Sequence, residues 1–141
     1  MFAVSCYTVA RYSDTGQMGC VHYGTYHKWF EDVQVAFLTK YGLSIKALRE
    51  AGVQLLPIEM KSKYLRPAFA GDELEIGMCI REVSNIKATA DFVITRVSDS
   101  AKIAQCGVTY VCTDETGRPQ LMKTAMPKLY QALQQAMMEQ V

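Results

Sequence analysis

The segment from Thr25 to Tyr41 limits most strongly what this chain can fold into. Its large side chains recur three and four residues apart, which places them on one face of a helix, with polar side chains opposite. Gly42 is a suitable end for that helix. The large residues are Tyr26, Trp29, Phe30, Val33, Phe37, Leu38 and Tyr41. A helix with such a face must bury it, so the rest of the chain must supply an apolar partner surface.

Alternating segments later in the chain are predicted to supply that surface. Leu74, Ile76, Met78 and Ile80 alternate with polar or small residues, which is typical of a half-buried strand. The pattern repeats over 88–97 and 103–112, which predicts an antiparallel meander of three strands. The other predicted elements are a strand over 2–9, a short helix over 44–51, an extended segment over 53–64 and a closing helix from Pro127.

These elements predict an α+β fold, with a single central helix wrapped by a curved antiparallel sheet. Pro57 favours an edge position or a bulge for its strand, because proline cannot donate to a strand ladder. The exposed edge of such a sheet needs covering, and pairing with a second copy would cover it. The 141 residues are therefore expected to form one domain, 1–141, that assembles as a homo-oligomer.

The composition removes several classes of protein. The formal charge is +1, which argues against a nucleic acid or an anionic membrane as partner. The five cysteines form no CxxC pair and no metal-ligand spacing, so we expect reduced thiols and no metal site. The sequence has no leader-like segment and no apolar run long enough for a membrane span, so a cytoplasmic protein is expected.

The loop before the long helix carries the residues best suited to chemistry. Between Arg11 and Tyr26 it contains an acid, glycines, a histidine and tyrosines, just ahead of a helix N-terminus. Unpaired backbone N–H groups and the helix dipole favour a developing negative oxygen there, so a thioester or ester carbonyl could be polarised at this point. Nucleotide-binding glycine loops, the GxSxG elbow and the HExxH helix are all absent.

Three motifs occur in a set order along the chain: Tyr12-x-Asp14-Thr15, the run from Gly19 through Tyr23 into Tyr26–Glu31, and Tyr64-x-x-Pro67-x-x-x-Gly71-Asp72. Together they resemble the hotdog-fold acyl-CoA thioesterases of the 4-hydroxybenzoyl-CoA thioesterase family, which includes the YbgC-like enzymes. The resemblance covers nearly the whole chain. It implies a sheet wrapped around a central helix, homodimers or homotetramers, no cofactor, and hydrolysis of acyl thioesters between two subunits.

One position departs from that family. Its members usually carry a catalytic aspartate where this chain has Gly16, and glycine has no side chain that can attack a carbonyl or accept a proton. The chain also resembles the enediyne polyketide thioesterases, a hotdog branch that lacks the acid at this place. That resemblance implies catalysis by positioning and carbonyl polarisation.

If the site hydrolyses thioesters, the backbone N–H of Tyr23 or Gly24 is expected at the carbonyl oxygen. The base that activates water would then be Asp14, His22 or Glu31. Each base candidate has a structural alternative. Asp14 could cap a turn, His22 could be a satisfied histidine, and Glu31 could be a solvated helix residue.

The remaining candidates concern substrate binding. Tyr26 and Trp29 could line an acyl pocket, although helical spacing favours the core for aromatic residues, and His27 is expected in solvent. Four cations could meet the phosphates of the carrier or be ordinary surface residues: Lys61, Lys63, Arg66 and Lys87.

The predicted function is hydrolysis of an acyl thioester of coenzyme A or acyl carrier protein. The first alternative is a protein that binds acyl-CoA or acyl carrier protein without catalysis, and a weaker one is a dehydratase or hydratase of the same fold.

Overall fold

The computed structural model describes residues 1–140, so only Val141 of the predicted domain lies outside the described residues. Five strands and four helices follow one another along the described chain, with a short 3₁₀ turn over Tyr12–Asp14. In chain order they are β1 (Val4–Val9), α1 (Tyr23–Lys40), α2 (Ile45–Glu50), β2 (Gln54–Tyr64), β3 (Glu73–Val83), β4 (Lys87–Arg96), β5 (Lys102–Thr113), α3 (Met122–Ala125) and α4 (Pro127–Glu139).

The strands form one antiparallel sheet in the order β1-β3-β4-β5-β2. The meander predicted for the three middle strands is confirmed as β3-β4-β5, and the α+β class is confirmed with it. Strand β2 lies at one edge, and its pairing with β5 shifts register between Pro57 and Glu59. Both readings of Pro57, an edge strand and a bulge, are therefore correct.

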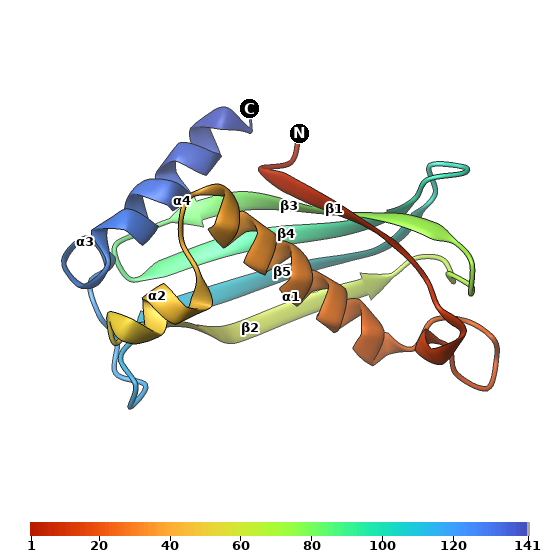
Figure 1. Cartoon of the computed structure of the whole chain (residues 1–141), viewed down its shortest axis with the longest axis horizontal. Helices are drawn as coiled ribbons and strands as arrows, with labels where there is room; N and C mark the ends of the chain where they lie inside the picture. The colour runs from red at the N-terminus through yellow and green to blue at the C-terminus, as the bar shows by residue number, and fades with distance from the viewer. Residues whose placement is uncertain (141) are drawn as a thin grey trace.

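Helix α1 lies across one face of the sheet (Figure 1) and buries its predicted apolar stripe there. Phe30 contacts Phe92 of β4, with ring centroids 5.1 Å apart, and Phe92 is fully buried. Sheet residues that face α1 alternate with residues that face away, as the period-two patterns predict.

The long central helix is confirmed, but it does not cover this face of the sheet alone. Helix α4 lies on the same face beside α1 (Figure 1) and adds Leu129 and Leu133 to the same core. One helix is too narrow to cover five strands, so α4 covers the end of β3 that α1 leaves open.

The long helix also begins earlier than predicted. It starts at Tyr23 rather than Thr25, because the His22 side chain accepts a hydrogen bond from the Gly24 N–H and acts as its N-cap. This cap decides which N–H groups at the helix start remain available.

Candidate functional site

A short hairpin delivers the chain to the start of α1. Thr15 and Val21 form an isolated antiparallel bridge, and the Gly16 N–H donates to the Cys20 carbonyl at 2.9 Å. The Val21 N–H donates to the Ala68 carbonyl at 2.8 Å, which ties the hairpin to the loop between β2 and β3. The position of the helix start is therefore set by two separate parts of the chain.

The first two N–H groups of α1 differ in their hydrogen bonding. The Gly24 N–H is occupied, because it donates to His22 Nδ1 at 3.0 Å. The Tyr23 N–H has no hydrogen-bond partner within residues 1–140. Of the two donors expected from the sequence, Tyr23 is thus the one that is free in this conformation, and it lies at the positive end of an 18-residue helix.

Two of the three base candidates are engaged in this loop. Asp14 Oδ2 accepts the Arg11 N–H at 2.9 Å and closes the 3₁₀ turn. The Nδ1 atom of His22 is taken by its capping bond. Gly16 is exposed at the hairpin, and a Cβ built at this position would meet no atom within 4 Å.

Aromatic rings pack beside the helix start. Tyr64 at the end of β2 stacks on Tyr26, with centroids 5.7 Å apart, and also contacts Tyr23 at 4.9 Å. Tyr26 and Trp29 are buried in the core, whereas the Tyr23 side chain is 65% exposed. Burial raises the pKa of the Tyr26 phenol.

The third base candidate, Glu31, lines a cavity of about 360 Å³ between α1 and the sheet. No hydrogen bond or ion pair engages the Glu31 carboxylate in the described part of the chain. The wall opposite is mainly apolar, and it is formed by Leu55, Pro57 and Met60 of β2 with Phe92, Val108 and Tyr110 of β4 and β5. A carboxylate beside an apolar cavity is suited to act on a water held there.

The same cavity holds polar groups that sequence reasoning missed. His27 was expected in solvent but is half-buried in the wall, where its ring packs edge-on against Phe30 at 5.8 Å. The Tyr110 hydroxyl donates to Gln34 Oε1 at 3.3 Å, and burial raises the pKa of the Tyr110 phenol. The spacing of His27, Glu31 and Gln34 puts them on one side of a helix, which is the only signal the sequence contains for this cluster.

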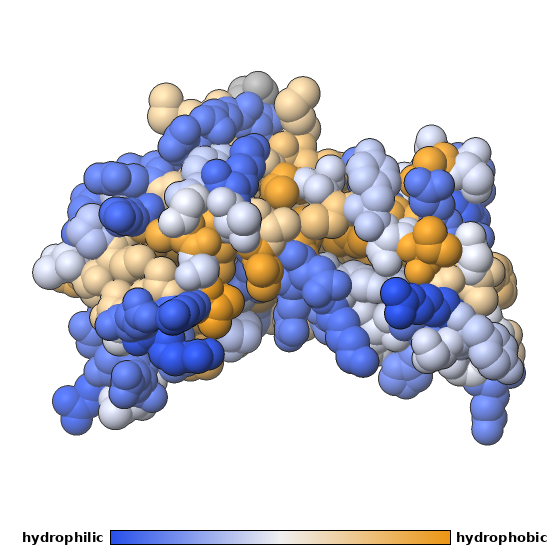
Figure 2. Space-filling view, in the orientation of Figure 1, coloured by the Kyte–Doolittle hydropathy of each residue, from blue (hydrophilic) through white to orange (hydrophobic). Residues whose placement is uncertain are grey.

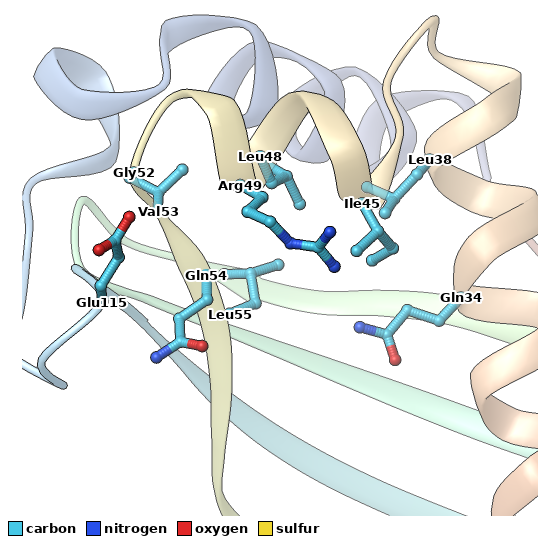
Figure 3. Close-up of a pocket in the computed structure, with 10 residues that line it drawn as sticks. All are labelled: Gln34, Leu38, Ile45, Leu48, Arg49, Gly52, Val53, Gln54, Leu55 and Glu115. Atoms are coloured by element: carbon cyan, nitrogen blue, oxygen red, sulfur yellow. The ribbon is translucent and has the colours of Figure 1, made fainter.

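A second cavity, of about 290 Å³, adjoins the first one beside α2 (Figure 3). Both cavities are lined by Gln34, Ile45 and Leu55, so they share a common wall region. Figure 2 shows apolar surface between α2 and α1, bordered by hydrophilic residues.

The four candidate cations do not form one cluster. Lys61 and Lys63 lie together on the face of the sheet away from α1, where Lys102 joins them. Lys87 lines a neighbouring depression on β4, and Arg66 is exposed beyond the end of β2 and lines neither.

Within residues 1–140, no group of three His, Cys, Asp or Glu residues is placed to hold a metal ion. Among the helices of those residues, none combines the length and the apolar character needed to cross a membrane.

Comparison with known proteins identifies the family of this chain. The family model for the "Thioesterase-like superfamily" matches residues 10–137. A protein of Bacillus subtilis named "Putative acyl-CoA thioesterase YneP" is 23% identical over 89% of this chain and 91% of its own length. A protein of Aquifex aeolicus named "Putative esterase" is 24% identical over 60% of this chain, and the match spans 66% of that protein.

Among solved structures, a DHNA-CoA thioesterase from Staphylococcus aureus matches with a TM-score of 0.87 and 18% identity, over 96% of this chain and 91% of that one. This likeness confirms the hotdog fold predicted from the motifs. Because the family model covers most of the sequence, from the loop before α1 to the closing helix, the chain belongs to the thioesterase-like superfamily.

Proposed function

We propose that this protein hydrolyses acyl thioesters, with the Tyr23 N–H as oxyanion donor and Glu31 as the base that activates water. One observation carries the proposal: α1 has an unpaired N–H at its start and, at Glu31, an unpaired and exposed carboxylate that borders a mainly apolar cavity. Within the superfamily, we place the chain in the 4-hydroxybenzoyl-CoA and YbgC-like branch, with Gly16 at the position of the usual aspartate.

The reaction follows from these two groups. The water oxygen bonds to the carbonyl carbon while Glu31 accepts a proton from the water. The negative charge that develops on the carbonyl oxygen is stabilised by the Tyr23 N–H and the dipole of α1. The carbon–sulfur bond then breaks, and the leaving sulfur takes the proton back from Glu31, so the products are a free acid and a thiol.

Glu31 is favoured as the base because the alternatives are engaged. Asp14 accepts the Arg11 N–H and His22 accepts the Gly24 N–H, so using either as a base would cost a local cap. Glu31 has no such bond to lose, and it faces the cavity in which an acyl group would fit.

The spacing of the two groups requires a second copy of the chain. Tyr23 and Glu31 are eight residues apart on one helix, which separates them by about 12 Å at 1.5 Å per residue. Reacting atoms must approach within roughly 3.5 Å of one another, so one chain cannot supply both groups to one thioester. We therefore propose that Tyr23 of one subunit and Glu31 of another form each site.

Strand β2 is the surface through which the copies are proposed to meet. Its outer edge is unpaired in the chain, and Leu56, Ile58 and Met60 are exposed along it. Unpaired apolar edge strands are normally covered, and pairing β2 with its copy would cover both. The proposed assembly is a homodimer, or a homotetramer built from two such dimers.

The proposed carrier is coenzyme A, with acyl carrier protein as the second possibility. The names of the Bacillus subtilis relative and of the Staphylococcus aureus structure both specify coenzyme A thioesters. Lys61 and Lys63 on β2 lie near the proposed subunit boundary and could bind carrier phosphates, as could Arg66 and Lys87. Tyr26 and Trp29 support the site from the core rather than line this cavity.

The test measures thiol release from a panel of acyl-CoA thioesters, for wild type and for Glu31→Gln. Loss of a general base lowers kcat by about 10²- to 10⁴-fold, so the variant should fall in that range. Asp32→Asn is the matched control, because Asp32 is the neighbouring acid of α1, is exposed as Glu31 is, and does not line the cavity; its rate should equal that of wild type. Equal rates for Glu31→Gln and wild type would remove Glu31 from the mechanism.

A binding protein without catalysis is the alternative. In that case no thioester in the panel is hydrolysed, while calorimetric titration still detects acyl-CoA binding. Such a result would replace the proposed hydrolysis by binding.

A further inference from the structure

We propose that the cavity beside α2 receives the far end of the acyl chain, and that Arg49 binds an anionic group there. The substrate class is then an acyl thioester whose chain ends in a carboxylate, remote from the thioester. This inference rests on the proposed function, because the acyl group is taken to lie beside Glu31.

The two cavities adjoin one another beside α1. The first contains Glu31, the second contains Arg49, and Gln34, Ile45 and Leu55 line both. From Glu31 in the first cavity to Leu38, which lines the second, α1 advances seven residues, about 10 Å at 1.5 Å per residue. An acyl chain of medium length therefore extends from one cavity into the other.

The second cavity has an apolar part, which suits the methylene groups of such a chain, and a polar lining of Gln34, Arg49, Gln54 and Glu115. The apolar part is formed by Leu38, Ile45, Leu48, Val53 and Leu55. Among residues 1–140, Arg49 is the only cation that lines this cavity.

Arg49 forms no ion pair with a carboxylate among the described residues. Arg96 pairs with Asp72 at 3.2 Å and with Asp99 at 3.1 Å, and Arg81 pairs with Asp91. On α2 itself, Glu50 pairs with Lys46, with 4.0 Å between the Lys46 Nζ and the Glu50 Oε1 atoms, and it does not pair with Arg49. The Arg49 guanidinium is therefore available to a ligand.

The orientation of the side chains favours an anion at the junction of the two cavities. In Figure 3 the Arg49 guanidinium points toward Ile45 and Gln34, and away from Glu115 on the opposite rim. Tyr110 donates to Gln34 Oε1, so the amide nitrogen of Gln34 is left to donate into the cavity. A carboxylate placed between them would accept from a guanidinium and an amide.

This arrangement discriminates by charge. A carboxylate that enters an apolar cavity loses its hydration, and it binds well only where a cation and donors replace the lost water. Wild type should therefore prefer the thioester with a terminal carboxylate over a plain chain of equal length. Without Arg49 the preference should disappear, while a plain chain should bind as before.

The experiment compares kcat/KM for suberyl-CoA, which has a free terminal carboxylate, with kcat/KM for octanoyl-CoA. Arg49→Gln should lower kcat/KM for suberyl-CoA about fivefold, because an ion pair with an exposed cation is lost. Its value for octanoyl-CoA should stay within about twofold of wild type, since the apolar walls are intact. Lys46→Gln removes a cation of the same helix that does not line the cavity, and it should leave kcat/KM unchanged for both substrates.

Two further outcomes separate this inference from the proposed function. If Arg49→Gln lowers kcat/KM equally for both substrates, or for neither, Arg49 does not bind the terminal carboxylate. The inference is then overturned, while the proposed hydrolysis stands. If neither substrate is hydrolysed, the proposed function fails, and titration calorimetry with the same two thioesters then decides whether the cavity binds. Preferential binding of suberyl-CoA that disappears in Arg49→Gln supports the cavity assignment, and equal binding overturns it.

Discussion

Replacing Tyr23 with proline tests the oxyanion donor directly, because it removes a backbone N–H that a side-chain substitution leaves in place. Tyr23 is the first residue of α1, a position where proline is well tolerated. The preceding residue, His22, has φ −73° and ψ 145°, which is the backbone region that a residue before proline prefers. The proline ring is therefore compatible with the backbone on both sides.

The expected effect on stability is small and the effect on rate is large. The Tyr23 N–H has no partner in residues 1–140, so no intramolecular hydrogen bond is lost with it. The lost ring contact with Tyr64 costs about 0.5–1.5 kcal/mol of unfolding free energy. Loss of one oxyanion donor lowers kcat by about 10²- to 10³-fold, equivalent to about 2.7–4 kcal/mol of transition-state stabilisation.

Tyr23→Ala is the matched control, since it removes the same ring and keeps the N–H. Thiol release is measured for both variants on a thioester that wild type hydrolyses, and thermal unfolding verifies that both are folded. Tyr23→Pro should be slower than Tyr23→Ala by the factor expected for the donor. If two folded variants have equal kcat, the start of α1 does not hold the oxyanion and the proposed mechanism is wrong.

Three further predictions concern the loop, the edge and the core. Gly16→Asp should raise kcat at least about tenfold by adding a carboxylate where a Cβ meets no neighbour; an unchanged rate would show that an acid at this position cannot reach the thioester. Ile58→Lys on β2 should shift the assembly toward monomer in analytical ultracentrifugation, whereas Ile86→Lys, away from that edge, should not. An unchanged assembly in Ile58→Lys would exclude the β2 edge as the interface. Phe92→Ala should lower the free energy of unfolding by about 3–5 kcal/mol in denaturant titration, and Val93→Ala on the outer face by less; similar losses would contradict the placement of the core.

Local patterns in the sequence predicted most of the fold. The three- and four-residue spacing predicted α1, and the period-two alternation predicted β3, β4 and β5, because each pattern reports which side of a single element is buried. Pro57 indicated the edge and the bulge of β2 for a local reason as well, the missing N–H. The family motifs lie in the loop before α1 and in the turn after β2, and the superfamily match bears them out at that level.

The sequence could not show which groups at the site are free. The choice among Asp14, His22 and Glu31 depends on hydrogen bonds, and only the folded loop shows that the first two are engaged. The cavity beside Glu31 is lined by Gln34 and Tyr110, which form a hydrogen bond although they lie 76 positions apart in the sequence. No periodic pattern reports such a contact, because the register of β5 in the sheet decides which of its residues faces α1.

The amino-acid sequence by itself determined the elements, their buried faces and the loop that carries the family's motifs, since these follow from short-range spacing and residue chemistry. The tertiary structure alone decided that α4 shares the sheet with α1, that the Tyr23 N–H and the Glu31 carboxylate have no partner within residues 1–140, and that Arg49 borders a cavity next to that of Glu31. These features arise where separate elements pack together, and packing is set by the whole chain.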